Sequence, residues 1–178
     1  MLLKALFMGC LSCSLNSCSI QPQNCSSGWK ITGFYTPVES DFSSPTKSEV
    51  IIAGTGKVLL DSQFVKKVRV EGWGRTQQNW YLGYYSGKWH KSEQPLNSLG
   101  LPLSIGDVAV DINIIQKGSL IVIPSIQGQF KNIEFKAVDV GSAIVNRHVD
   151  IYTGEGKQAK HETWKITGNH QVCIKSSN

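Results

Sequence analysis

The chain has 178 residues, of which 40% are hydrophobic and 17% are charged. This length and composition fit one globular domain and exclude a large multidomain enzyme, a disordered chain and a collagen-like fibre. Lys and Arg number 18 against 13 Asp and Glu, a net charge of +5. Such a mild positive charge suits an anionic polymer as a partner but does not identify it.

The N-terminal segment has the pattern of a signal peptide. It carries one charge, Lys4, then an apolar stretch, and no acidic residue precedes Glu39; it is too short to span a membrane. Residues 15–18 (LNSC) resemble a bacterial lipobox, in which the cysteine is acylated. We therefore expect a signal peptide at 1–17, a lipid anchor on Cys18, a tether at 18–28 and a place in the cell envelope, in the periplasm or on the outer membrane. Ordinary secretion is the alternative.

The cysteine count agrees with this processing. Of the five cysteines, Cys10 and Cys13 would leave with the signal and Cys18 would carry the lipid, so that Cys25 and Cys173 remain. In an oxidising compartment these two can form a disulfide that stabilises the fold by at most about 5 kcal/mol. Two unpaired thiols are the alternative. The four histidines lack the spacing of zinc ligands, so we expect no metal.

The rest of the chain is predicted to be β. Short runs rich in β-branched and aromatic residues alternate with Gly and Pro turns, a pattern typical of a barrel or sandwich. Only Lys157 to Glu162 looks helical. The predicted strands are 29–35, 65–70, 80–85, 106–110, 119–123, 135–139, 148–152 and 172–175.

Three aspartates occupy similar positions in the second half of the chain. Asp111, Asp139 and Asp150 each lie at or inside a β-like apolar run. A carboxylate in such a place must accept hydrogen bonds or have a raised pKa. A single Asp of this kind usually fixes a turn. Three together favour glycosidic chemistry, in which one carboxyl group stays protonated near neutral pH and acts as an acid.

Four segments that contain these aspartates carry a family resemblance. They are GDVAVD (106–111), KGSLIVIP (117–124), AVDVGSAI (137–144) and NRHVDIY (146–152) followed by Gly154. In this order they resemble the three-aspartate (3D) domain, the catalytic barrel of the membrane-bound lytic transglycosylase A family and its small relatives. The match runs from Gly106 to about Ile174. Upstream, TGFYTPV (32–38) is similar to the segment by which larger members enter the barrel.

The resemblance implies an all-β fold, a six-stranded double-psi β-barrel over 29–178 with extra strands and loops and little helix. An insertion at about 38–105 replaces the larger second domain of the bigger enzymes, so we expect a more open groove. The implied activity is that of a lytic transglycosylase on peptidoglycan glycan strands, with no cofactor. Asp150 would protonate the oxygen between N-acetylmuramic acid and N-acetylglucosamine, and the muramic 6-hydroxyl would attack C1 to give a 1,6-anhydro end.

Other residues are expected to support this chemistry. Asp139 would raise the pKa of Asp150 by charge repulsion and bond a sugar hydroxyl, and Asp111 would assist or simply lock a loop. Gly141 would allow the backbone to approach the ligand, and Thr36 would contact the sugar. Among the aromatic residues between 73 and 89, Trp80 and Trp89 are the candidates for stacking on sugar rings, although core packing or cross-strand pairing is the alternative.

Two other functions remain open on the sequence alone. The barrel can bind or loosen the cell wall without cleaving it, as related double-psi barrels do, or it can be a hydrolase in which Asp139 or Asp111 activates water. Nucleic-acid binding is not expected, because the Lys residues are scattered and no recognition helix or RNA-binding aromatic motif is present.

Overall fold

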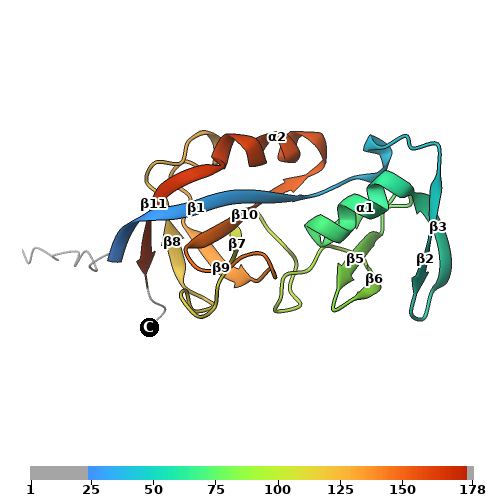
Figure 1. Cartoon of the computed structure of the whole chain (residues 1–178), viewed down its shortest axis with the longest axis horizontal. Coiled ribbons are helices and arrows are strands. Elements are labelled where there is room, and N and C mark those ends of the chain that lie inside the picture. The colour runs from blue at the N-terminus through green and yellow to red at the C-terminus, as the bar shows by residue number, and fades with distance from the viewer. Residues whose placement is uncertain (1–23, 176–178) are drawn as a thin grey trace, which may run out of the picture.

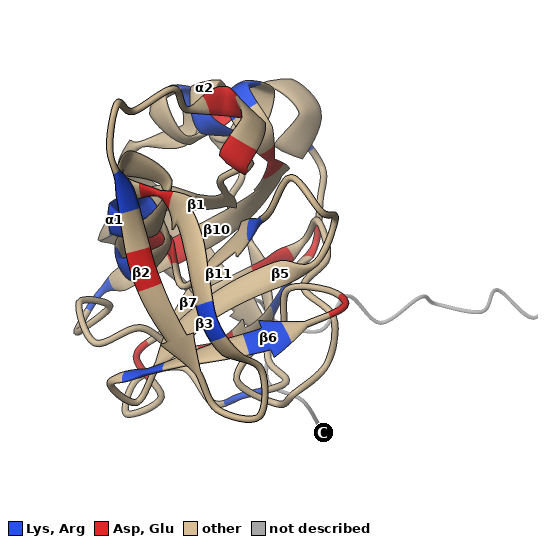
Figure 2. Ribbon diagram, turned by 90° about the vertical axis from the view of Figure 1, so that its right-hand side faces the viewer, with Lys and Arg blue, Asp and Glu red and all other residues tan. Residues whose placement is uncertain are grey.

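The computed structural model describes residues 24–175. Within this range the chain is mostly β, as predicted, and its strands form a closed barrel and a separate five-stranded sheet (Figure 1). The predicted signal peptide and Cys18 lie outside the described residues. Neither helix of the described part is long and apolar enough to cross a membrane. Basic and acidic residues are interspersed along the ribbon on the side of the molecule that Figure 2 shows.

The barrel has the strand order β1-β10-β7-β9-β8-β11. Strands β1 and β10 pair in parallel, as do β7 and β9, and the other neighbours pair antiparallel. Alternate side chains such as Ile31, Val149 and Ile151 are fully buried in its core. Its strands are β1 (Asn24–Thr36), β7 (Asp107–Val110), β8 (Leu120–Val122), β9 (Phe135–Asp139), β10 (His148–Glu155) and β11 (Gly168–Lys175). β1 thus begins inside the segment predicted to be a tether.

Helix α2 (Gly156–Ile166) follows β10 and covers β1 (Figure 1). It includes the predicted helical stretch and extends it at both ends. Gly33 of β1 allows the close packing, because a Cβ at this position would lie 2.9 Å from Cα of Thr163. The glycine of the TGFYTPV segment therefore places the strand against the helix.

The second sheet is formed by residues between β1 and β7 and has the order β3-β2-β6-β5-β4. It packs with helix α1 around its own core, which includes Val50, Leu60, Phe64 and Leu82. Its strands are β2 (Lys47–Ile52), β3 (Gly56–Asp61), β4 (Trp73–Arg75), β5 (Tyr81–Tyr85) and β6 (Lys88–Ser92). Short 3-10 turns occur at Glu39–Asp41 and Gly128–Phe130.

Helix α1 (Ser62–Glu71) corrects the prediction of a strand at 65–70. The carboxylate of Asp61 caps the helix by accepting hydrogen bonds from the backbone N–H groups of Gln63 and Phe64. Gly72 ends it with φ of 87°, a conformation that favours glycine. Phe64, Val65 and Val68 are buried on one face. The wrong prediction came from the alternation of Val68 and Val70 with Arg69; in the helix, Val70 is exposed.

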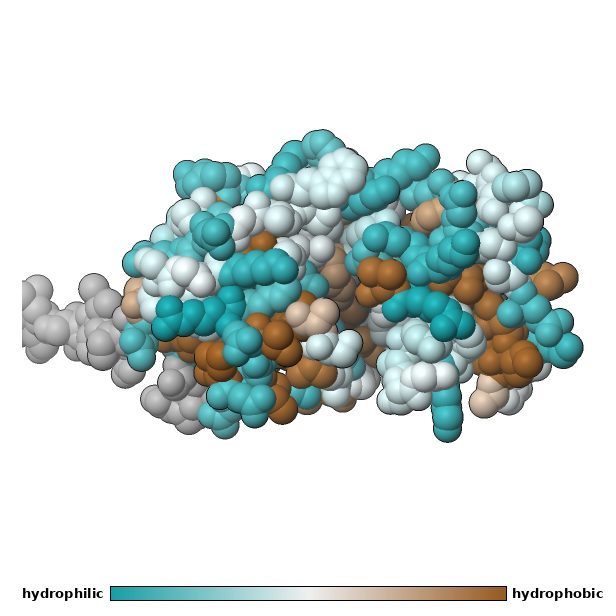
Figure 3. Space-filling view, in the orientation of Figure 1, coloured by the Kyte–Doolittle hydropathy of each residue, from teal (hydrophilic) through white to brown (hydrophobic). Residues whose placement is uncertain are grey.

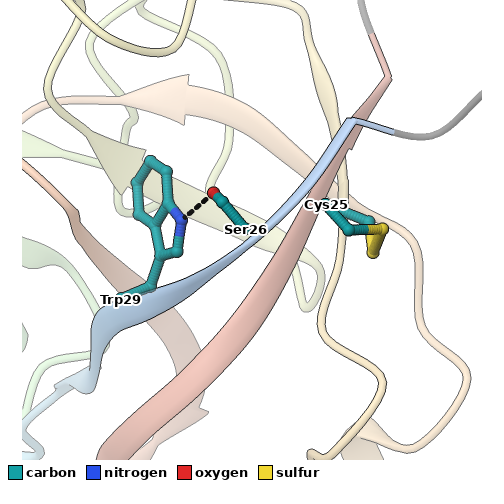
Figure 4. Close-up of a disulfide and its surroundings, with 4 residues drawn as sticks. Cys25, Ser26 and Trp29 are labelled. Carbon is teal, nitrogen blue, oxygen red and sulfur yellow. Dashed lines mark hydrogen bonds between the residues drawn. A yellow bond between two sulfur atoms is a disulfide. The ribbon is translucent and has the colours of Figure 1, made fainter.

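Cys25 and Cys173 face each other across β1 and β11 and are joined in a disulfide (Figure 4). Beside it, the indole N–H of Trp29 donates a 2.8 Å hydrogen bond to Ser26. Because the two cysteines are 148 positions apart, the bridge ties together the first and last strands of the barrel.

Polar contacts hold the second sheet beside the barrel. The backbone N–H of Arg75 donates to the carbonyl of Pro37 at 2.8 Å. The carboxylate of Glu155, at the end of β10, accepts a 2.7 Å hydrogen bond from the hydroxyl of Tyr81 and pairs with the Arg75 guanidinium at 3.0 Å. These contacts fix the walls of the space between the two sheets.

Candidate active site

A cleft of about 870 Å³ lies between the barrel and the second sheet. The surface of the molecule is hollowed between these two halves (Figure 3). Strands β1 and β10 and the loop after β9 supply the barrel side of the cleft, while the end of α1, β5 and the loop at 96–103 supply the other side. Asp150, Asp139 and Gly141 line this cleft.

Strand register aligns four of the residues that line it. Thr32 of β1 pairs with Asp150 of β10, Asp150 pairs with Ala109 of β7, and Ala109 pairs with Asp139 of β9. Residues paired in this way share one face of a sheet. The two aspartates are therefore two strand spacings apart, about 10 Å between their backbones. The small side chain of Ala109 leaves the space between them open.

Asp150 is largely withdrawn from water yet faces the cleft. Its neighbours along the strand, Val149 and Ile151, are fully buried in the barrel core, so the side chain of Asp150 points outward. Burial raises its pKa to about 6; the Thr32 hydrogen bond lowers it, and the negative charges of Glu71 and Asp139 raise it further. A carboxyl group with this pKa is partly protonated near neutral pH and can donate a proton.

Thr32 connects Asp150 to a histidine. The Thr32 hydroxyl lies 2.6 Å from Oδ1 of Asp150 and 2.8 Å from Nε2 of His148. His148 is 8% exposed and lines the same cleft. Burial and the nearby charge of Lys30 lower the pKa of His148, so its ring is neutral at neutral pH. Both residues belong to segments that the sequence analysis singled out, but neither was predicted as a site residue.

Glu71 is a second site residue that the sequence analysis missed. It is the last residue of α1, and its carboxylate accepts a 3.1 Å hydrogen bond from the backbone N–H of Tyr35 and pairs with Lys67 at 2.6 Å. It lines the cleft, and its charge affects the pKa of Asp150 more than that of Asp139 does. Glu71 was missed because the residues just before it, 65–70, were predicted to form a strand.

Asp139 lies in the cleft at the end of β9. Its Oδ1 accepts 2.9 Å hydrogen bonds from the backbone N–H groups of Ser98 and Val140. Burial raises the pKa of Asp139, against the effect of these bonds and of Lys117. The residue therefore has two features at once: it fixes the loop at 96–103 to the barrel, and its carboxyl group borders the same space as Asp150.

Asp111 is not among the residues that line the cleft. Its carboxylate accepts hydrogen bonds from the backbone N–H and side-chain amide of Asn113, each at 2.9 Å, and from the backbone N–H of Asn146 at 2.7 Å. The backbone bonds lower its pKa. This geometry fits the alternative in which Asp111 locks two loops together, and not a part in proton transfer.

Thr36 does not have the position expected of a sugar contact, whereas Gly141 borders the cleft. Thr36 is 1% exposed, and its hydroxyl lies 2.9 Å from that of Tyr152, so it has almost no surface to offer a ligand. Gly141 lines the cleft, but a Cβ there would lie 2.9 Å from Cγ1 of Ile144. The space beside Gly141 is thus filled by a side chain of the protein itself.

The predicted sugar platforms Trp80 and Trp89 also lie outside the cleft lining. Trp80 packs on the core of the second sheet beneath Lys91, and Trp89 packs with Tyr84 and Arg69. Other rings of the same aromatic stretch border the cleft, namely Trp73, Tyr84 and Tyr85. Tyr85 is 48% exposed and stacks on His90, so it is the ring with most surface free for a ligand.

Comparisons with known proteins agree with this architecture. The 3D domain family model matches residues 107–174, and no curated protein matches the chain. Escherichia coli MltA with bound chitohexaose has a similar structure, with a TM-score of 0.59 and 16% identity over 84% of this chain and 72% of that one. A membrane-bound lytic murein transglycosylase from Agrobacterium tumefaciens has a TM-score of 0.55 and 14% identity, over 82% of this chain and 73% of that one. MltA from Neisseria gonorrhoeae has a TM-score of 0.55 and 14% identity, over 84% of this chain and 72% of that one.

These matches identify one domain and the fold. Residues 107–174 form a 3D domain, as the four sequence segments predicted. The fold is similar to that of the MltA lytic transglycosylases over most of the chain.

Proposed function

We propose that this protein is a lytic transglycosylase that cleaves the β-1,4 bond between N-acetylmuramic acid and N-acetylglucosamine in peptidoglycan. The observation that carries the proposal is Asp150, a mostly buried carboxyl group with a pKa raised to about 6 that faces a cleft of about 870 Å³. The MltA-like fold supports it, since one MltA structure holds the glycan chitohexaose. We further propose that the barrel is of the double-psi type.

The reaction needs one group that first gives and then takes a proton. Protonated Asp150 donates its proton to the glycosidic oxygen as the bond from that oxygen to C1 breaks. The 6-hydroxyl of the muramic acid then forms a bond to C1, and its proton goes to the Asp150 carboxylate. The proton balance is zero and no water is consumed, so the product carries a 1,6-anhydro ring and Asp150 returns to its acid form.

The surroundings of Asp150 fit this cycle. Burial and the negative charge of Glu71 keep the carboxyl group protonated at higher pH, and Thr32 stabilises its charged form. Asp139 adds a smaller repulsion and can bond a sugar hydroxyl across the open space at Ala109. Tyr85, and not Trp80 or Trp89, is the ring we propose for stacking against a sugar face.

The location of the protein is part of the proposal. Lipid attachment at Cys18 would tether the barrel to an envelope membrane, within reach of the glycan strands. The Cys25–Cys173 disulfide suits an oxidising compartment outside the cytoplasm. Substitution Cys18→Ser should move the protein from the membrane fraction to the soluble fraction. An unchanged distribution would contradict the anchor.

Mass analysis of the products released from purified sacculi tests the activity. We expect muropeptides with 1,6-anhydro ends from the parent protein, none from Asp150→Asn and a reduced amount from Asp139→Asn. Asp41→Asn is the matched control, because Asp41 lies outside the cleft and pairs with Lys157 at the surface. Reducing ends would indicate a hydrolase, and bound but unchanged glycan would indicate a wall-binding protein.

A further inference from the structure

A chain of hydrogen bonds links the proposed acid to a histidine that the mechanism does not use. Oδ1 of Asp150, Oγ1 of Thr32 and Nε2 of His148 follow one another at 2.6 and 2.8 Å. Thr32 and Asp150 are paired in register on adjacent parallel strands, and His148 lies two residues before Asp150 on the same face. All three residues line the cleft.

The hydrogens available to this chain permit two arrangements. A threonine hydroxyl has one hydrogen to donate, and a neutral imidazole nitrogen either donates or accepts. When Asp150 is ionised, Thr32 donates to the carboxylate and Nε2–H of His148 donates to Thr32. When Asp150 is protonated, its O–H donates to Thr32 and Thr32 donates to Nε2 of His148. Each arrangement pairs Asp150, Thr32 and Nε2 of His148, which are partly buried. In the second, the other ring nitrogen carries the hydrogen and can donate to the backbone of Ala143; the first gives up that bond, because a neutral ring has only one N–H.

We propose that Thr32 and His148 are positioning residues that hold the Asp150 carboxyl group in one orientation in both of its protonation states. The inference rests on the proposed function, because only a group that alternates between acid and base needs support in both forms. His148 acts through Thr32 and does not touch the substrate. Its imidazole can serve both arrangements because it can present Nε2 either as a donor or as an acceptor.

The hydrogen-bonded chain from Asp150 through Thr32 to His148, called the relay below, is needed most when Asp150 has given up its proton. The new carboxylate must stay in place until the 6-hydroxyl proton arrives, and a free carboxyl group could rotate away. The bond from Thr32 is then charge-assisted and short, and the His148 donor prevents Thr32 from turning its hydrogen elsewhere. Because charge-assisted bonds are the stronger ones, the relay stabilises the ionised form of Asp150 more than the protonated form.

The other charged groups near Asp150 come from several elements. Lys30 lies on β1, Glu71 at the end of α1, and Asp139 at the end of β9, while β7 presents only Ala109. Lys30 also acts on His148, as does a hydrogen bond with the backbone of Ala143. Lys30, Glu71 and Asp139 are unchanged by substitutions at Thr32 or His148. His148→Phe also removes the bond with Ala143, so the Thr32 variants measure the contribution of the relay most directly.

Two pairs of variants test the relay, with titration of the Asp150 carboxyl carbon by ¹³C NMR as the readout. Thr32→Val removes the hydroxyl and Thr32→Ser keeps it. His148→Phe removes the nitrogen, whereas His148→Gln keeps a group that can donate or accept. The controls are Thr55→Val and His161→Phe, at exposed positions outside the cleft. Asp150→Asn assigns the signal, and thermal unfolding shows that each variant is folded.

We expect Thr32→Val to raise the Asp150 titration midpoint by roughly one pH unit and His148→Phe to raise it by less. Thr32→Ser and His148→Gln should stay near the parent. For release of anhydro-muropeptides, kcat/KM should fall roughly 10- to 100-fold in the Val and Phe variants and recover in the Ser and Gln variants. The relay is refuted if His148→Phe titrates like the parent, or if His148→Gln shifts as far as His148→Phe. The proposed function fails separately if the midpoints shift as expected but the parent releases no anhydro product.

Discussion

At the scale of single residues, the raised pKa of Asp150 has a consequence for stability that requires no substrate. Burial moves this pKa from its ordinary 3.8 to about 6, so the folded protein binds the proton more tightly than the unfolded chain. The associated stability is fully present below about pH 4 and is lost as the pH rises through about 6. At pH 7 the ionised, buried carboxylate therefore costs folding free energy.

Asp150→Asn should accordingly stabilise the protein at pH 7, because the amide cannot ionise. We expect the free energy of unfolding to rise by about 3 kcal/mol at pH 7, with the difference disappearing below about pH 4. Urea unfolding at the two pH values measures this, with Asp41→Asn as the control for a surface carboxylate. A loss of stability at pH 7 would show that the Asp150 carboxylate is well accommodated and not strained by burial.

Glu71 offers a test of the charges around the acid. Its negative charge raises the pKa of Asp150, so Glu71→Gln should lower that pKa by a few tenths of a pH unit and move the descending limb of activity to lower pH. The control is Glu49→Gln, which removes an exposed acid that pairs with Lys57 at 3.0 Å. If the descending limb of the pH–activity profile stays in place or moves to higher pH, Glu71 does not raise the pKa of Asp150.

Sequence reasoning found some of the residues of this site and missed others for identifiable reasons. The apolar runs singled out Asp111, Asp139 and Asp150 alike, and the resemblance to the 3D domain then assigned Asp150 as the acid. Thr32 and His148 were not predicted as site residues, because their contact depends on the parallel pairing of strands that are more than a hundred residues apart. Trp80 and Trp89 were chosen from an aromatic stretch. Which of its rings face the cleft and which face the core depends on how the strands pair in the second sheet.

At the scale of elements, helix α1 is the part that carries Glu71 to the cleft, and Asp61 caps it. Although burial alone would raise the pKa of Asp61, hydrogen bonds from the backbone N–H groups of Phe64, Ser44 and Gln63 lower it. Asp61→Ala should reduce the free energy of unfolding by about 1–2 kcal/mol at pH 7. Asp61→Asn, which keeps a capping oxygen, should lose clearly less.

The pH dependence of the stability contributed by the Asp61 cap tests the same hydrogen bonds. Because the folded-state pKa of Asp61 is lowered, its contribution is present above its ordinary pKa of 3.8 and is lost as the pH falls through the folded value. The difference between the parent and Asp61→Ala should therefore shrink in acid. Equal losses in the Ala and Asn variants, unchanged by pH, would contradict a role for the carboxylate as a cap.

The elements also show where local patterns were sufficient. Strands β7, β9 and β10 were predicted within one to three residues, since their apolar runs are short and are bounded by Gly, Pro or charged residues. Helix α1 was read as a strand because Val68 and Val70 alternate with Arg69 along the chain, although Val70 is exposed in the structure. Strands β2 and β3 were missed.

At the scale of the whole molecule, the Cys25–Cys173 disulfide joins the ends of the barrel. In the chain-entropy model a loop of this length is worth about 5 kcal/mol at most, and measured losses are typically about 2–5 kcal/mol. Cys25→Ser should lower the free energy of unfolding by that amount, and the Cys25→Ser, Cys173→Ser double variant should lose no more. With a reductant that opens the disulfide of the parent, the parent and the variants should have the same free energy of unfolding. A double variant much less stable than either single one would show that the thiols act separately.

The position of the insertion beside the barrel could not be predicted from the sequence. The insertion at 38–105 supplies α1, β5 and the aromatic side of the cleft; that this cleft is more open than in the larger enzymes stays a prediction. The placement of the insertion depends on contacts such as those of Glu155 with Arg75 and Tyr81. These join positions more than seventy residues apart and leave no local pattern along the chain.

The most direct test of the account is the pH dependence of anhydro-muropeptide release from purified sacculi by the parent and by Asp150→Asn. If protonated Asp150 is the donor, kcat/KM of the parent should decrease as the pH rises through about 6, and the variant should release no anhydro product at any pH at which it remains folded. Release by Asp150→Asn at the parent's rate and with the parent's profile would contradict the assignment.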